Sequence, residues 1–216
     1  MKLWEDILDL IYPTICPGCG KVTERDTVWC EDCIRRIWNP RLINSSRSEH
    51  LDGCYTLCNY EGEIRECILQ LKYNGKIERK KSFPPLLHRF PYWDRLKECT
   101  PVIPVPLSKA KMKTRGYNQV DMIFKEWMEK EGKTYLPHGL VRFRTAETQS
   151  LLSRRERKEN IKGVFHVNHG IDLTGKTVLL VDDVYTTGAT MESAAHELIR
   201  AGAEKVMGLT IASGAV

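Results

Sequence analysis

The sequence predicts an α/β fold, with a mostly parallel sheet that carries helices on both faces, preceded by a small N-terminal module. Two observations lead to this prediction. Strand-like apolar runs alternate with helix-like segments between residues 51 and 211, which is the pattern of a parallel sheet with helical crossovers. Near the N-terminus, four of the eight cysteines fall in two C-x-x-C pairs.

The N-terminal module is built on Cys16-Pro-Gly-Cys19 and Cys30-Glu-Asp-Cys33. Each C-x-x-C turn directs two thiolates to one point, and the glycine after the first pair lets backbone N–H groups face the sulfurs. Together the pairs can supply a closed tetrahedral four-sulfur site suited to structural zinc. A redox pair or unrelated buried thiols is the alternative. Cys54 and Cys58 lack this spacing and are expected in the core of a strand.

Two further features delimit this module. Apolar residues at helical spacing predict a short amphipathic helix that ends before Pro13: Leu3, Trp4, Ile7, Leu8 and Ile11. A polar stretch at residues 44–48 reads as a linker. We therefore expect one domain at residues 1–45 and a second at residues 46–216, with entry helices over about 51–98 and the core sheet over 100–216.

Within the second domain, residues 51–60 alternate as in a strand, and residues 64–71 step as in a helix. A short buried strand is expected at 101–105, a helix at 118–130 and a strand at 140–143. A polar basic segment follows. The pattern ends with a strand at 177–181, a helix at 190–201 and a strand at 206–211.

The stretch VLLVDDVYTTGAT covers residues 178–190. It places two acids and a glycine turn between the strand predicted at 177–181 and the helix predicted at 190–201. Ligands of such sheets bind at the carboxyl ends of the strands. Backbone N–H groups, threonine hydroxyls and the positive end of the next helix would converge there on an anion. The predicted anion-binding residues are Thr186, Thr187, Gly188, Ala189 and Thr190.

Asp182 and Asp183 lie beside this turn in the sequence. Because carboxylates repel a phosphate, they are expected to meet ribose hydroxyls or a hydrated Mg²⁺ ion. A phosphate pocket next to acceptors for a diol describes a ribose 5-phosphate. The alternative is a strand end with acids and an ordinary threonine cap. The chain contains no G-x-G-x-x-G.

VLLVDDVYTTGAT resembles the phosphoribosyl-pyrophosphate signature of type I phosphoribosyltransferases, and the whole chain resembles the ComF family of bacterial DNA uptake and competence. CPGCG with WCEDC resembles that family's zinc ribbon. LKYNGK, IPVPLSK, RGYNQ and TQSLLSRRERKENIKGVF resemble its later motifs in order. Tyr185 departs from the transferase signature, which favours an aliphatic residue there.

The resemblance implies a type I phosphoribosyltransferase-like fold that binds 5-phosphoribosyl 1-pyrophosphate with Mg²⁺. Asp182 and Asp183, the candidate catalytic residues, would lie at the ribose, and residues 105–109 would hold pyrophosphate. Lys109 or Lys72 could offset charge on the leaving group. Arg115 is a further substrate-binding candidate. An active enzyme would displace pyrophosphate with a nitrogen nucleophile, and residues 144–157 are a candidate for a loop over the site.

A second interpretation is a nucleic-acid-binding module with a regulatory or vestigial ligand site. Basic clusters at residues 72–81, 109–115 and 142–162, with tyrosines among them, suit a single-stranded path. They also suit pyrophosphate binding or a solvated surface. The ComF resemblance implies single-stranded DNA and a DNA-uptake helicase or other competence proteins as partners.

The composition limits the setting. The net charge of +5 permits a polyanionic partner without requiring one. No segment approaches the roughly 20 apolar residues of a membrane span, and the N-terminus makes a poor signal peptide. We therefore expect a cytoplasmic protein whose cysteines are metal ligands or buried thiols.

Overall fold

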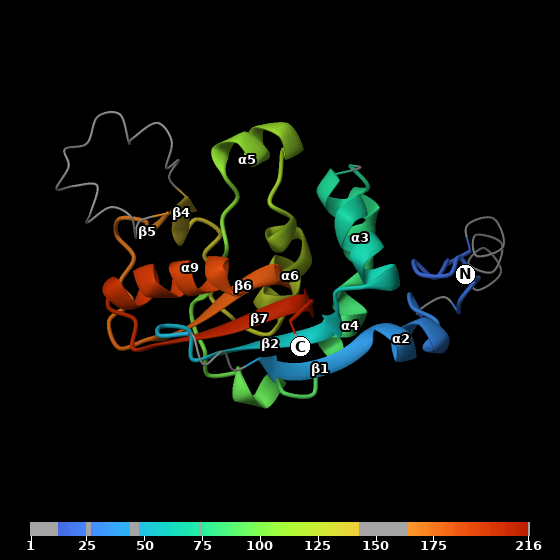
Figure 1. Cartoon of the computed structure of the whole chain (residues 1–216), viewed down its shortest axis with the longest axis horizontal. Helices are drawn as coiled ribbons and strands as arrows, with labels where there is room; N and C mark the ends of the chain where they lie inside the picture. Colours follow the sequence, from blue (N-terminus) through green and yellow to red (C-terminus); the bar gives the residue numbers. More distant parts are fainter. Residues whose placement is uncertain (1–12, 25–26, 44–47, 74, 143–163, 216) are drawn as a thin grey trace.

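The computed structural model describes residues 13–24, 27–43, 48–73, 75–142 and 164–215 (Figure 1). The amphipathic helix predicted near the N-terminus and the loop predicted at residues 144–157 lie outside these residues.

A five-stranded sheet forms the centre of the molecule, in the order β1-β2-β7-β6-β3. β2, β7, β6 and β3 are parallel to their neighbours, and only β1 is antiparallel to β2. The prediction of a mostly parallel sheet is therefore confirmed. The strands are β1 (Trp38–Ile43), β2 (Gly53–Asn59), β3 (Val102–Pro104), β6 (Thr177–Tyr185) and β7 (Lys205–Ser213).

Helices cover both faces of this sheet, as predicted. Leu179 and Val181 of β6 belong to one core cluster, together with apolar residues of α2 (Glu31–Ile37) and of three further helices. Val178 and Leu180 alternate with them and belong to a second cluster on the opposite face, together with α9. The helices of the first face are α3 (Gly62–Tyr73), α4 (Pro84–His88) and α6 (Gln119–Lys130), and the second face carries α9 (Ala189–Arg200).

Shorter elements complete the chain. β4 (Leu140–Arg142) and β5 (Phe165–Val167) pair as a separate two-stranded sheet, so the strand predicted at 140–143 forms outside the main sheet. β6 continues four residues beyond the predicted Val181, which places both predicted acids inside the strand. The other short elements are α2 (Glu31–Ile37), η1 (Ile77–Ser82), η2 (Trp93–Arg95) and α5 (Lys109–Arg115).

The N-terminal module packs tightly against the larger part of the chain. Trp29, Cys16 and Cys33 are buried in the same core cluster as α3. The Trp29 indole also donates a hydrogen bond of 2.7 Å to the Ser82 carbonyl at the end of η1. β1 precedes the expected boundary and pairs with β2, so a division near residue 45 stays a prediction.

The segment that enters β2 is held by one carboxylate of α9. Glu192 accepts hydrogen bonds from the backbone N–H groups of Glu49, His50 and Leu51, and it also contacts the His50 ring. These bonds hold residues 49–51 against the face of the sheet that α9 covers.

Within the part of the chain that the structure describes, no helix has both the length and the apolar character needed to cross a bilayer.

Candidate functional site

Asp183 is the centre of a buried polar network near the carboxyl end of β6. Its residue is only 3% exposed. Lys72 of α3 donates a hydrogen bond of 2.8 Å to one carboxylate oxygen, and Gln119 of α6 donates one of 2.6 Å to the other. The Gln119 carbonyl oxygen in turn accepts from Arg115. Both oxygens of Asp183 therefore have protein partners, and three elements meet at this carboxylate.

Asp182 points toward the other face of the sheet, because side chains alternate along a strand. It is half-buried, and one of its oxygens accepts the backbone N–H of Asp183 at 2.8 Å. Burial and the neighbouring Asp183 carboxylate raise the pKa of Asp182 to about 8, although Lys72 and Arg142 oppose this shift. Asp182 can thus take up or release a proton near neutral pH.

The turn after β6 is shaped by Gly188 and Tyr185. Gly188 adopts φ +78°, and its carbonyl accepts the N–H of Glu192 in the first turn of α9. A Cβ at residue 188 would be strained and would collide with the hydroxyl of the buried Tyr185. The departure at Tyr185 thus fills the space beneath the turn. Thr186, Thr187, Ala189 and Thr190 are exposed, and the Ala189 N–H donates a hydrogen bond of 3.4 Å to the Thr187 hydroxyl oxygen.

The predicted cations border two different cavities, separated by α5. Lys109 lines the larger cavity, about 1010 Å³, which lies between α5, β4, β5 and the second half of α9. Lys72 and Arg115 line the smaller one, about 450 Å³, between α3 and α5. Asp182, Asp183 and the glycine turn line neither cavity. The structure therefore joins Lys72 and Arg115 to Asp183 and places Lys109 on the opposite side of α5.

Two residues of this region were not assigned a role from the sequence. Gln119 stands in the RGYNQ motif, directly after the Asn118 cap of α6, and nothing in its spacing shows that it will reach Asp183. Arg142 ends β4, close enough to lower the pKa of Asp182. Both contacts arise between segments far apart in the chain, which explains why periodicity did not reveal them.

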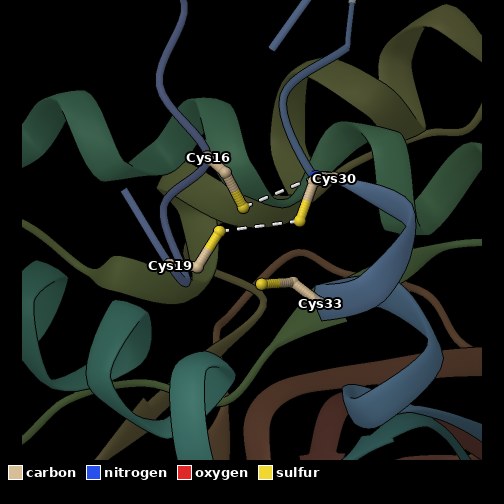
Figure 2. A group of neighbouring side chains, drawn as sticks. All are labelled: Cys16, Cys19, Cys30 and Cys33. Atoms are coloured by element: carbon tan, nitrogen blue, oxygen red, sulfur yellow. Dashed lines mark hydrogen bonds between the residues drawn. The ribbon is translucent and has the colours of Figure 1, made fainter. Parts of the chain in front are cut away.

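The four N-terminal cysteines form a compact cluster (Figure 2). Their sulfurs lie within 4.8 Å of one another, and those of Cys19 and Cys30 are 3.6 Å apart. Tetrahedral Zn–S bonds of 2.3 Å require sulfurs roughly 3.8 Å apart, so the cluster fits zinc. Burial acts to raise the pKa of Cys16, but backbone N–H groups of Cys19, Cys30 and Gly18 lower it to about 6, which favours the thiolate.

The cysteine cluster is tied to the first turn of α3. Arg36 donates to the Cys33 sulfur at 3.0 Å and also pairs with Glu63. Gly18 fits closely here, since a Cβ would stand 2.8 Å from the Cys33 sulfur and 2.9 Å from a Glu63 carbon. The ribbon thus rests on the helix whose last turn carries Lys72.

Comparisons with known proteins agree with this architecture. The Phosphoribosyl transferase domain family matches residues 141–215, and the Double zinc ribbon domain family matches residues 7–43. Competence protein ComFC of Streptococcus pneumoniae is 30% identical over 191 residues, covering 88% of this chain and 77% of that protein. The chain belongs to the ComFC family.

Two further relatives match over a similar share of this chain. ComFC of Bacillus subtilis is 28% identical over 193 residues, which cover 87% of this chain and 72% of that protein. DNA utilization protein YhgH of Escherichia coli K12 is 28% identical over 202 residues, which cover 89% and 81%. These matches confirm the sequence resemblance, and together with the cysteine cluster they support a structural zinc.

Replacing Lys72 tests the buried pair. Lys72→Met leaves the Asp183 charge buried without its cation, and we expect the free energy of unfolding to fall by about 3 kcal/mol. Urea unfolding followed by circular dichroism measures this loss. Lys76→Met removes a neighbouring exposed lysine and serves as the control. Equal midpoints for the two variants would contradict a stabilising role for the pair.

The cysteine cluster makes a separate prediction. Cys19→Ser should reduce bound zinc from one equivalent per chain to a small fraction, as measured by elemental analysis of the purified protein. Hydrogen exchange should then accelerate in residues 14–37 and in the first turn of α3, because Arg36 and Glu63 join these segments. Cys99→Ser changes a buried thiol outside the cluster and should retain zinc. Full zinc retention by Cys19→Ser would refute the four-sulfur site.

Proposed function

We propose that this ComFC-family protein binds 5-phosphoribosyl 1-pyrophosphate at the carboxyl ends of β3 and β6. The observation that carries the proposal is the turn at Gly188, which is the N-cap of α9 and follows the strand that contains Asp182. The first N–H groups of a helix have no intrahelical acceptor, and the helix dipole adds positive potential there. Exposed threonine hydroxyls complete a set of donors suited to a monoester phosphate.

Each part of the ligand has a candidate position. The 5-phosphate would lie on Thr186, Thr187, Gly188, Ala189 and Thr190, and the ribose hydroxyls would donate to Asp182. Pyrophosphate would lie along residues 105–109, since the Val105 N–H pairs with the Val181 carbonyl and so holds this loop next to β6. Lys109, exposed at the start of α5, would offset the pyrophosphate charge.

The two acids have different proposed roles. One carboxylate oxygen of Asp182 accepts the backbone N–H of Asp183, and the other takes no part in the hydrogen bonds of the Asp183 side chain. We therefore place the Asp182 carboxylate against the ribose. Asp183 holds Lys72 and Gln119 through its two oxygens. We propose that it acts as a positioning residue, which keeps Lys72 and Arg115 beside the site.

The donor set also suits Mg²⁺. Mg²⁺ in proteins often takes one or two carboxylates together with phosphate oxygens of the substrate and water. Asp182 is the carboxylate that would hold it here, and the ion would supply charge neutralisation at the pyrophosphate.

If the protein is an active phosphoribosyltransferase, a nitrogen nucleophile would form the bond to the anomeric carbon. The bond from that carbon to pyrophosphate would break, with its electron pair leaving on the pyrophosphate. The chain's own contribution would be electrostatic, with Lys109 facing the charge that develops on the leaving group.

Calorimetric titration with 5-phosphoribosyl 1-pyrophosphate in Mg²⁺ tests this proposal. Binding should strengthen as the pH rises from 7 toward 8, by up to about tenfold per unit, because the Asp182 proton must leave before the carboxylate engages the ligand. Asp182→Asn should abolish this pH dependence and weaken binding.

Asp94→Asn, at an exposed acid remote from the turn, is the matched control and should behave as wild type. Wild-type affinity in Asp182→Asn would remove this carboxylate from the site. Absence of any binding at pH 8 with Mg²⁺ would refute the function itself.

A second proposed function is the handling of single-stranded DNA in natural transformation, with a DNA-uptake helicase or other competence proteins as partners. Its support is the names of the relatives, which include competence and DNA utilization proteins, and the exposed cations of α5. None of the eight cysteines forms a disulfide, which suits a reducing compartment, and we propose a cytoplasmic location.

DNA binding through α5 predicts a steep salt dependence. Affinity for a single strand should fall with a logarithmic slope of about 0.7 for each phosphate neutralised, and the double variant Lys111→Ala with Lys113→Ala should lower that slope by about 1.4. Fluorescence anisotropy with a labelled oligonucleotide at several salt concentrations measures it. Lys125→Ala with Lys130→Ala, on α6, is the control. A slope unchanged by the α5 variant would exclude this path.

A further inference from the structure

The cleft between α3 and α5 is the smaller of the two cavities, and its lining differs from that of the larger one. It measures about 450 Å³, within the range of small-ligand sites. Lys111 and Arg115 supply positive charge, Lys72 is paired with Asp183, and Tyr73 and Tyr117 supply aromatic surface. Among the described residues that line it, none is acidic. This combination favours a ligand that is both planar and negatively charged.

Tyr73 has the exposure of a binding residue. Among the described residues, Tyr73 is one of the few large hydrophobic residues that are exposed, with 67% of its surface accessible. The Arg115 guanidinium lies 5.2 Å from the centre of its ring. Aromatic rings and guanidinium planes are the two side-chain surfaces on which nucleobases stack.

The walls of the cleft are fixed by contacts outside it. The Tyr117 hydroxyl donates to the Leu71 carbonyl near the end of α3, which joins the α5 side to the α3 side. Arg115 is held by Gln119, and Lys72 is held by Asp183. Because these groups are already in place, little side-chain freedom would be lost on binding.

We propose that this cleft binds one nucleotide unit, with its base stacked on Tyr73 and its phosphate near Lys111 and Arg115. The proposal deepens the proposed function and rests on it, because Lys72 lines the cleft and is bonded to Asp183, the chain neighbour of the Asp182 assigned to the ribose. The larger cavity is a weaker candidate for a new site, since it contains part of the loop assigned to pyrophosphate.

Thymidine 5′-monophosphate and a thymidine tetranucleotide are the probes, titrated by calorimetry into the zinc-containing full-length protein. Tyr73→Leu should weaken binding of the mononucleotide about 5- to 150-fold, as expected for loss of one base–aromatic stack, and Tyr73→Phe should restore it. Lys111→Ala should weaken binding of both probes. A higher affinity for the tetranucleotide would identify a strand as the natural source, and equal affinities would identify a free nucleotide.

Arg65→Ala is the matched control, because Arg65 lies over Tyr60, 6.0 Å from its ring centre, and outside the cleft. It should leave both affinities unchanged. Wild-type affinity in Tyr73→Leu, or no mononucleotide binding by the wild type, would overturn the nucleotide site. Titration with 5-phosphoribosyl 1-pyrophosphate separates the two proposals. If the protein binds the nucleotide but not 5-phosphoribosyl 1-pyrophosphate, only the phosphoribosyl site is refuted. If it binds 5-phosphoribosyl 1-pyrophosphate but not the nucleotide, only the cleft is refuted.

Discussion

The contacts of Asp183 organise the whole carboxyl edge of the sheet. A carboxylate this deeply buried is costly unless each oxygen has a partner, and here a lysine and an amide satisfy them. The partners come from α3 and α6, so the requirement to satisfy one charge fixes two helices relative to β6. Through Gln119 the same requirement reaches Arg115 at the end of α5. The hydrogen bonds of Asp183 thus determine the positions of Lys72 and Arg115, two of the three cations that line the smaller cavity.

The zinc ribbon packs against this arrangement. Its buried Cys16, Cys33 and Trp29 share a core cluster with α3. Arg36 and Glu63 connect the cysteine cluster to the first turn of that helix, and Lys72 stands in its last turn. A structural metal site at one end of α3 therefore supports a charged group of the candidate site at the other end. The physical link is a single helix anchored at both of its termini.

Strand geometry explains why two adjacent acids do different things. Successive side chains of β6 enter opposite core faces, so Asp183 meets α3 and α6 while Asp182 faces the side that α9 covers. Burial and the adjacent Asp183 carboxylate raise the pKa of Asp182. Helix α5 extends the same division, because Lys109 borders the larger cavity and Arg115 the smaller one.

Local patterns in the sequence determined a large part of this protein. The alternation of strands and helices, the two C-x-x-C pairs and the glycine turn of residues 186–190 each depend on residues close together in the chain, and each was predicted. The path of β1 into the main sheet, the contact of Gln119 with Asp183 and the separation of Lys109 from Lys72 were decided only by the tertiary structure. These features join segments that are far apart in the chain, and Lys72 and Asp183 are 111 residues apart. Spacing along a chain records which face of an element a residue occupies, whereas the packing of elements decides what that face meets.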